Sequence, residues 1–315
     1  MSDERGKAAA VDLSVDIAGA RLRNPVIAAS GTFGYGREYA QIMDAARLGG
    51  VCTKGLTLNP RLGNAGVRVW ETPSGLLNSI GLENPGVRAF IRDELPFLRG
   101  LGPAVIANLS GSTVDEYVEG AGLLDESDVD MVELNVSCPN VKAGGMAFGL
   151  DPEAAAAVTA RVRRALRGKP LMVKLSPNAA DLSAVARACV GAGADAVSLV
   201  NTFKAMAIDA RSRAPVFENV TAGLSGPAIR PIALRMVWEL RAALDPRIPI
   251  VGMGGVACAD DALEFLMAGA AAVQIGSATF ANPGAALETI DGIEAYMRDN
   301  GLASPGDISI RGRAT

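Results

Sequence analysis

Histidine is absent from this chain of 315 residues. A Ser-His-Asp triad, a Cys-His pair and most catalytic zinc sites require an imidazole, so the sequence excludes all three. The four cysteines, at positions 52, 138, 189 and 258, lie far apart and form no C-x-x-C pair. This spacing excludes the usual zinc and iron–sulfur motifs within the chain and is typical of reduced thiols in a cytoplasmic protein. We therefore expect no metal site, and a group other than histidine must move protons if the protein is an enzyme.

Long apolar runs and an excess of positive charge are also lacking. The longest uncharged run, residues 265–287, is interrupted by Gly, Gln, Asn and Pro, so we expect no membrane span. The net charge of −4 and the pI near 5.1 argue against a nucleic-acid or anionic-membrane partner held by a basic face. Residues 1–10 are charged and lack an apolar centre, so we expect a flexible tail over residues 1–12 rather than a signal peptide.

Short apolar runs recur at regular intervals along the chain, as in parallel strands that are covered on both faces. They occupy residues 25–30, 50–54, 103–110, 131–137, 171–176, 196–201, 248–254 and 271–276. Segments with a helical pattern lie between them, at residues 37–47, 87–99, 113–124, 152–167, 181–191, 227–244, 259–268 and 284–299. This alternation predicts a (β/α)₈ TIM barrel. A doubly wound sheet is the alternative, but Gly31–Gly36 lacks the G-x-G-x-x-G spacing that such a sheet typically carries.

The expected domain covers residues 13–300, followed by a C-terminal tail at 301–315. Residues 13–19 alternate apolar and polar side chains before a turn, which predicts an N-terminal β-hairpin that closes the bottom of the barrel. Three strand-to-helix connections, at residues 55–85, 138–150 and 202–225, are long. Because connections after barrel strands lie at the C-terminal face, we expect these to be active-site loops.

Polar side chains gather where the predicted strands end. The strand ends carry Ser30, Lys54, Asn108, Asn135, Cys138, Lys174, Asn201 and Thr202. Amides offer both donors and acceptors, so several amides and two lysines at one end of a barrel suit a polar, planar ligand. Asn135 and Asn201 end apolar strands, where an unsatisfied amide is costly, which favours ligand binding. Asn78 and Asn140 lie in connections, where Asn is common in turns, and either role is open to them.

Glycines follow the last two predicted strands. Gly254-Gly255 and Gly276-Ser277 stand where barrels commonly bind phosphate through backbone N–H groups. The alternative is that each pair only forms a tight turn. The two pairs together favour a phosphate site.

Lys174 lies inside a predicted strand, where an unpaired ammonium is costly to bury. It could form a Schiff base, as in barrel aldolases, or place a positive charge near an electron-rich cofactor. It could also reach the end of the barrel for packing alone. Lys54 raises the same question.

Cys138 differs from the other cysteines because it follows a strand and opens a long, glycine-containing connection. It could act as a nucleophile or as a general base. Without histidine, its activation would come from the lysines or from backbone dipoles. Buried thiols are more often inert, and we expect this of Cys52, Cys189 and Cys258.

Six motifs together resemble class 1 dihydroorotate dehydrogenase. They are ASGTFGYG (29–36), NSIGLENPG (78–86), ELNVSCPNVKAGGMAFG (133–149), VKLSPN (173–178), LSGPAIRP (224–231) and GMGG (252–255). They occur in order and at compatible spacing, and the resemblance runs from about residue 13 to residue 290. It implies a (β/α)₈ barrel with one FMN per chain that oxidises dihydroorotate to orotate in de novo pyrimidine (UMP) biosynthesis.

The resemblance also implies roles for individual residues. Cys138 would be the base that removes a proton from C5 of dihydroorotate while hydride leaves C6 for N5 of the flavin. Lys174 would lie near the N1/O2 edge of the flavin and favour its anionic reduced form. The implied substrate-binding residues are Lys54, Asn78, Ser79, Ile80, Gly81, Leu82, Asn135, Asn140, Asn201 and Thr202. The implied FMN-binding residues are Ser30, Lys54, Gly55, Asn108, Asn135, Lys174, Val200, Gly226, Gly254, Gly255, Gly276 and Ser277.

Class 1 contains two forms, which differ in their electron acceptor. One is a homodimer that passes electrons to fumarate. The other is a homodimer core in a heterotetramer with a subunit that carries FAD and a 2Fe-2S cluster, and it reaches NAD⁺. The stretches SGTFGYGRE, GGMAFG and LSGPAIRP resemble the second form more closely. We therefore expect the NAD-linked form, and its iron–sulfur cluster would belong to the partner because the cysteines here lack the spacing.

Three other functions are compatible with parts of the pattern. A Schiff-base aldolase would use Lys174 on the same barrel. A tRNA-reducing flavoprotein of similar barrel type also uses cysteine, but the acidic pI and the absence of a basic appendage argue against it. A non-catalytic flavin- or phosphate-binding protein would need no base.

Overall fold

The structure is a computed structural model that describes residues 11–136 and 148–310. Eight parallel strands close into a barrel in the order β10-β15-β16-β3-β4-β7-β8-β9. In chain order they are β3 Val26–Ala28, β4 Gly50–Cys52, β7 Ala104–Leu109, β8 Met131–Asn135, β9 Leu171–Lys174, β10 Ala196–Leu199, β15 Ile250–Met253 and β16 Ala272–Ile275. The predicted (β/α)₈ barrel is therefore confirmed, and the doubly wound sheet is excluded.

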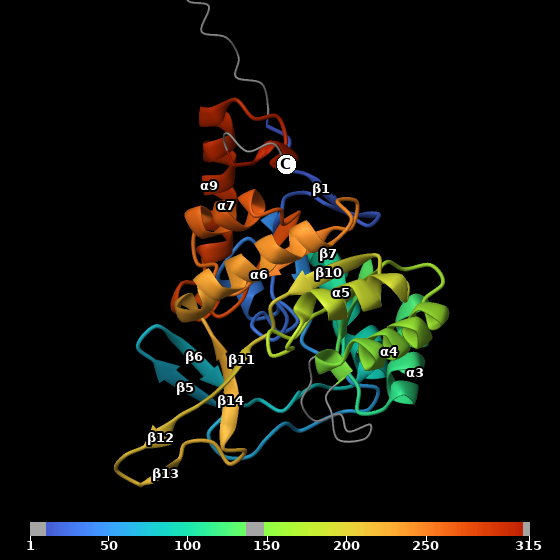
Figure 1. The fold of residues 1–315 in the computed structure, drawn as a ribbon, viewed down its shortest axis with the longest axis vertical. Coiled ribbons are helices and arrows are strands. Elements are labelled where there is room, and N and C mark those ends of the chain that lie inside the picture. Colours follow the sequence, from blue (N-terminus) through green and yellow to red (C-terminus); the bar gives the residue numbers. More distant parts are fainter. Residues whose placement is uncertain (1–10, 137–147, 311–315) are drawn as a thin grey trace, which may run out of the picture.

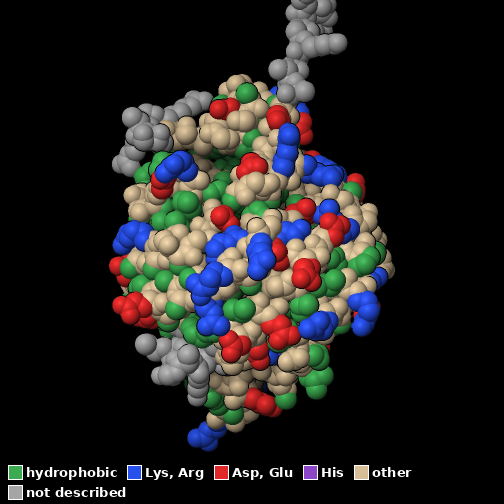
Figure 2. Space-filling view, turned by 90° about the vertical axis from the view of Figure 1, so that its right-hand side faces the viewer, with side chains coloured by type: hydrophobic (Ala, Val, Ile, Leu, Met, Phe, Trp, Pro, Cys, Tyr) green, Lys and Arg blue, Asp and Glu red, His purple; other side chains and the backbone are tan. Residues whose placement is uncertain are grey.

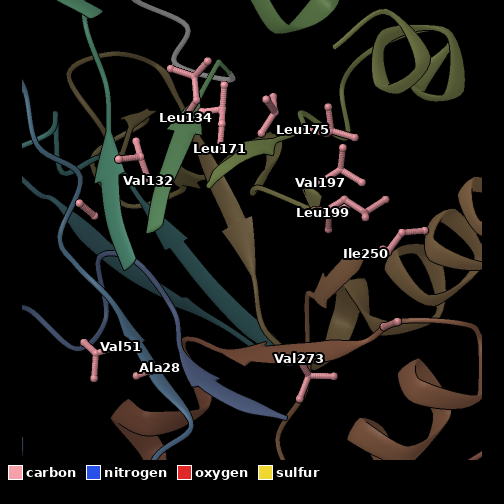
Figure 3. Close-up of a cluster of buried hydrophobic side chains, with 14 of the residues drawn as sticks. Ala28, Val51, Val132, Leu134, Leu171, Leu175, Val197, Leu199, Ile250 and Val273 are labelled. Carbon is pink, nitrogen blue, oxygen red and sulfur yellow. The ribbon is translucent and has the colours of Figure 1, made fainter. Parts of the chain in front are cut away.

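Helices surround the barrel and cover its outer face (Figure 1). They are α1 Val87–Ala89, which continues through a π-helical stretch into α2 Leu95–Leu101, then α3 Val114–Asp125, α4 Pro152–Ala165, α5 Leu182–Gly191, α6 Arg230–Ala243, α7 Ala259–Met267 and α9 Ala285–Asn300. Outward strand side chains such as Val132, Leu134 and Val197 point away from the barrel axis (Figure 3). They lie in the main hydrophobic core. Alternate strand residues therefore face the helices, and those between them face the barrel interior.

The helix predicted at residues 37–47 is wrong. The segment forms two short 3₁₀ turns, Tyr39–Gln41 and Ala45–Arg47. The Asp44 side chain accepts a hydrogen bond from the Ala46 backbone N–H, so a local cap competes with helix continuation. The other seven predicted helices all contain helical structure.

The N-terminal hairpin closes the bottom of the barrel, as predicted. It consists of β1 Val15–Ile17 and β2 Ala20–Leu22, paired antiparallel. Ile17, Ala20 and Leu22 pack in one buried cluster with inward strand residues such as Cys52 and Met131. The bottom layer of the interior is thus apolar, which leaves polar chemistry to the layers above it.

Two of the long connections form a sheet that the sequence pattern did not predict. β5 Val69–Thr72, β6 Gly75–Asn78, β11 Phe203–Met206 and β14 Thr221–Ser225 make a four-stranded antiparallel sheet. A smaller ribbon, β12 Ile208–Asp209 with β13 Ala214–Pro215, extends from it. In Figure 1 this sheet lies at the end of the barrel opposite the β1 hairpin, so the connections are ordered walls of the C-terminal end.

The segment after α9 packs against the domain. Pro305 and Ile308 are buried, and the Asp12 backbone N–H donates to the Ala303 carbonyl over 3.3 Å.

The short helix α8 Ala278–Ala281 follows β16. On the face in Figure 2, basic and acidic side chains are interspersed, with no broad basic area. Within the described residues, no helix is long and apolar enough to cross a membrane.

Candidate active site

The upper layers of the barrel interior are polar. Asn135 at the end of β8 lies opposite Lys174 in β9, and Lys174 lies opposite Ser198 in β10. Lys174 is 6% exposed and Asn135 is 9% exposed. The Tyr117 hydroxyl donates to the Asn135 backbone carbonyl over 2.8 Å and holds this strand end in place. The structure therefore brings the amide and the ammonium together, as the strand positions predict.

Besides the Tyr35 hydroxyl, which lies beside Phe90, three buried side-chain oxygens have no hydrogen-bond partner among the residues the structure describes. They are Asn108 Oδ1, Ser110 Oγ and Gln274 Oε1. An unsatisfied buried acceptor is costly, so each is a candidate for a bound ligand. A Cβ placed on Gly55 would lie 3.0 Å from Asn108 Oδ1 and 3.7 Å from Ser110 Oγ. The absence of a side chain at Gly55 keeps this edge open.

Lys54 follows strand β4 and lies two residues after Cys52, so its side chain points toward the same interior, one layer nearer the C-terminal end of the barrel. Its Nζ is 3.9 Å from a Cβ built on Gly31, which places it beside the end of β3. Burial lowers the pKa of Lys54 from its usual value, the nearby Glu83 carboxylate opposes this, and Arg68 adds to it. A desolvated ammonium is a favourable site for an anionic ligand.

Asn201 and Thr202 join the same end of the barrel. The Asn201 amide donates to Asn135 Oδ1 over 3.4 Å, and the Thr202 backbone N–H donates to Asn201 Oδ1 over 2.8 Å. The Asn178 amide donates to the Thr202 carbonyl over 3.3 Å. β14 crosses directly above, because a Cβ on Gly223 would lie 2.2 Å from Thr202 Oγ1.

The segment Asn78–Leu82 forms the wall opposite. The Asn78 amide donates to the Gly223 carbonyl over 3.2 Å. Ser79 accepts from Asn64 Nδ2 over 3.0 Å. Gly81 has φ +76°, and Asn64 leaves no room for a side chain there. Leu82 lies near Gly55, since a Cβ on Gly55 would be 3.2 Å from its Cδ2.

The glycine-rich ends of the last two strands are tightly enclosed. Gly254 and Gly255 have positive φ, and Cβ atoms there would meet Val200 Cγ2 at 3.0 Å and the Gly226 carbonyl at 2.8 Å, respectively. Gly276 and Ser277 lead directly into α8. A short helix after the last strand is the usual setting of barrel phosphate sites.

Glu133 and Gln274 are interior residues that were not predicted from the sequence. Glu133 is completely buried two residues before Asn135, and Gln274 lies two residues before Gly276. The period of two along a strand could have found both, because it places them on the inward face below predicted site residues. Their hydrophobic neighbours hid the signal.

Cys138 and Asn140 lie outside the described residues. Of the other cysteines, Cys52 and Cys189 are buried, as expected, but Cys258 is exposed, because it precedes α7 at the surface. Burial raises the pKa of Cys52 well above its usual value and that of Cys189 to about 11. Within residues 11–136 and 148–310, no group of three or more His, Cys, Asp or Glu side chains could hold a metal ion.

The fold and the site define a (β/α)₈ barrel with an enclosed, cationic and amide-lined C-terminal end, suited to polar, planar, anionic ligands. The family model for dihydroorotate dehydrogenase matches residues 12–297. The chain belongs to the dihydroorotate dehydrogenase family, and the resemblance of its motifs is confirmed.

Curated relatives are similar over almost their whole length. A protein of Petrotoga mobilis is 54% identical over 298 residues, which cover 95% of this chain and 98% of the relative. One of Pelobacter propionicus is 53% identical, with 94% and 97% covered, and one of Thermoanaerobacter pseudethanolicus is 52% identical, with 95% and 98% covered. Each is named dihydroorotate dehydrogenase B (NAD(+)), catalytic subunit.

Proposed function

We propose that this protein is the catalytic subunit of an NAD-linked dihydroorotate dehydrogenase and oxidises dihydroorotate to orotate in pyrimidine biosynthesis. The observation that carries the proposal is the 54% identity to a relative of that name over 95% of the chain. The chemistry of the barrel end agrees, because dihydroorotate is a small ring with a carboxylate and alternating C=O and N–H edges. Lys54 supplies a cation, and the amides of Asn78, Asn135 and Asn201 supply donors and acceptors.

The proposed cofactor is FMN, one per chain. The residues fit it: the unsatisfied Asn108 Oδ1 could accept from a ring N–H, and the buried Lys174 would place a positive charge beside an electron-rich ring system. Gly254-Gly255 and Gly276-Ser277 would bind the phosphate, where barrels of this kind commonly do so. Ser30, Gly55, Val200 and Gly226 would line the remaining surface. When bound, the flavin supplies a hydride acceptor.

The substrate would lie between the flavin and the four-stranded sheet. Lys54 would bind its carboxylate, and Asn135, Asn201 and Thr202 would read the ring edge from the barrel strands. From the wall, Asn78 to Leu82 would close the site and exclude water. We further propose that Asn140 completes the amide set.

Cys138 is the proposed general base. The thiolate would take the proton from C5 while the hydride leaves C6, so the C5–C6 single bond becomes the double bond of orotate. No histidine exists in the chain to perform this step, and the buried Cys52 and Cys189 thiols are held protonated. The burial of Lys54 makes the site favourable for anions, and the same cation would stabilise the Cys138 thiolate.

The partner proposed for this chain is an electron-transfer subunit with FAD and a 2Fe-2S cluster, bound to a homodimer of this chain as a heterotetramer. Two observations support it: the words "catalytic subunit" and "NAD(+)" in the names of the relatives, and the scattered cysteines here. We propose that the assembly works in the cytoplasm.

Anaerobic reduction tests the proposal. The purified chain should be yellow, release FMN on denaturation, and lose its flavin absorbance when dihydroorotate is added, with orotate formed in equal amount. A colourless protein, or a flavin that dihydroorotate does not reduce, would refute it. Borohydride trapping of a carbonyl substrate on Lys174 would instead support the aldolase.

A further inference from the structure

A buried carboxylate organises the layer of the barrel directly below the proposed flavin site. Glu133 is 0% exposed, and four side chains donate hydrogen bonds to it from four other strands. The donors are Cys52 Sγ at 3.0 Å, Asn108 Nδ2 at 3.1 Å, Ser198 Oγ at 2.8 Å and Gln274 Nε2 at 3.3 Å. Apolar side chains in place of such a buried charged network often stabilise a protein as well or better, so stability alone does not explain the network.

Glu133 is ionised in the folded protein. Burial opposes ionisation, but the Lys174 ammonium and the hydrogen bonds from Cys52, Ser198 and Asn108 together hold the pKa of the carboxyl below its usual value. Lys174 is itself 6% exposed on the adjacent strand β9. The two opposite charges therefore offset each other in the interior, where an isolated charge would be very costly.

The carboxylate also decides how two amides are oriented. An ionised carboxylate only accepts hydrogen bonds, so the group that Asn108 turns toward it must be the NH₂. Asn108 Oδ1 then points elsewhere and has no partner among the described residues. Gln274 follows the same rule, with Nε2 on Glu133 and Oε1 unsatisfied. Because both amides turn their NH₂ groups toward Glu133, the side-chain carbonyl oxygens of Asn108 and Gln274 point away from it and remain available to a ligand.

We infer that Glu133 is a positioning residue for the flavin. It holds the Asn108 amide so that the amide oxygen faces the flavin ring, and it offsets the charge of Lys174, so that the net charge of the pair tunes the reduction potential of the flavin. This inference rests on the proposed FMN site. This role is distinct from a purely structural one. A carboxylate that only held the strands together would affect stability, but its charge would not alter the reduction potential of the flavin.

The test is the midpoint potential of the FMN-loaded chain. Glu133→Gln keeps the shape but removes the charge and adds a donor, so Lys174 is left uncompensated and a neighbouring amide must turn. The potential should rise, because an unbalanced positive charge favours the anionic reduced flavin, and the FMN dissociation constant should increase about tenfold. Ser198→Ala is the matched control: it removes one hydrogen bond from the same carboxylate and retains the charge, so its potential should stay near that of the wild type.

A double variant measures the coupling. In Lys174→Met the carboxyl loses the cation that offsets its charge, so it should ionise only at higher pH, whereas in Glu133→Gln/Lys174→Met both charges are gone at every pH. The potential of Lys174→Met should therefore fall below that of the double variant as pH rises, and the two potentials should converge at low pH. This comparison decides the matter even where Glu133→Gln alone does not fold. Equal potentials in Lys174→Met and the double variant at every pH, or a shift in Glu133→Gln no larger than in Ser198→Ala, would overturn the inference. Wild-type protein that binds no FMN would instead overturn the proposed function.

Discussion

At the scale of single residues, the chain concentrates its proton chemistry in one proposed group. The absence of histidine leaves thiols, lysines and carboxylates as candidates. Glu133 is ionised but fully enclosed by four donors, so it cannot reach a substrate proton. Burial raises the pKa of Cys52 and Cys189, which makes both poor bases near neutral pH. The elimination of these buried groups supports Cys138 as the proposed base.

Replacing Cys138 should affect the chemical step and leave FMN bound. Cys138→Ala should lower turnover by about 10² to 10⁴, the usual contribution of a positioned general base. Cys138→Ser should retain some activity with its optimum at higher pH, because a hydroxyl loses its proton less readily. Stopped-flow reduction of the flavin across pH measures both. Cys258→Ala, at an exposed thiol, is the control and should match the wild type. An unchanged pH profile in the serine variant would contradict base catalysis.

The buried Glu133 carboxylate should make the free energy of unfolding depend on pH. The folded pKa of Glu133 is lowered from its ordinary 4.5, so its contribution to stability is fully present above that pH and is lost as pH falls through the folded value. Glu133→Gln should therefore be less stable than the wild type by about 3 kcal/mol at neutral pH. The difference should narrow as pH falls from 4.5 to the lower folded value, because the unfolded chain takes up the proton before the folded protein does. Urea unfolding of both proteins at a series of pH values measures it, and a difference that is constant down to low pH would contradict the ionised state.

At the scale of secondary-structure elements, the sequence predicts what is apolar and periodic and fails elsewhere. All eight barrel strands could be located because strands such as β9 and β15 are buried on both faces. The sheet of β5, β6, β11 and β14 could not, since its strands are partly exposed and its central pairing joins β6 to β14, more than a hundred residues further along the chain. The same limit hid Glu133, whose four partners come from four different strands. Site residues at strand ends were predictable, whereas the network that orients them depends on the register between strands.

The contact between that sheet and the barrel gives a prediction about specificity. Gly223→Ala would place a Cβ 2.2 Å from Thr202 Oγ1, so either β14 or Thr202 must move. Thr202 is a proposed substrate contact, and we expect KM for dihydroorotate to rise about 10- to 100-fold with FMN still bound. Gly191→Ala is the matched control, because nothing lies within 4 Å of its Cβ at the end of α5. Steady-state kinetics of the two variants measure the difference, and equal KM values would place the substrate away from this strand.

At the scale of the whole molecule, the electrons taken from the substrate must leave through the C-terminal end of the barrel or its walls. The flavin proposed here would lie between the polar interior layer and the four-stranded sheet, enclosed by ordered walls. The cysteines of the chain are too scattered for an iron–sulfur cluster, and the described residues offer no metal-binding group of His, Cys, Asp or Glu. Transfer to NAD⁺ therefore needs redox groups that this chain does not supply.

Because this chain lacks these redox groups, we expect the rate of flavin reoxidation to depend sharply on the acceptor and on the partner. The isolated, FMN-loaded chain, reduced by dihydroorotate under anaerobic conditions, should be reoxidised by NAD⁺ at a negligible rate. Adding the electron-transfer subunit with its FAD and 2Fe-2S cluster should restore NAD⁺-dependent reoxidation, and a subunit from which the cluster has been removed is the control that should not. Fumarate tests the alternative form of the family: rapid reoxidation by fumarate without any partner would assign the chain to the homodimeric form. Rapid reoxidation by NAD⁺ without a partner would contradict both, because it would require direct hydride transfer to nicotinamide at the enclosed barrel end, in the place proposed for the pyrimidine.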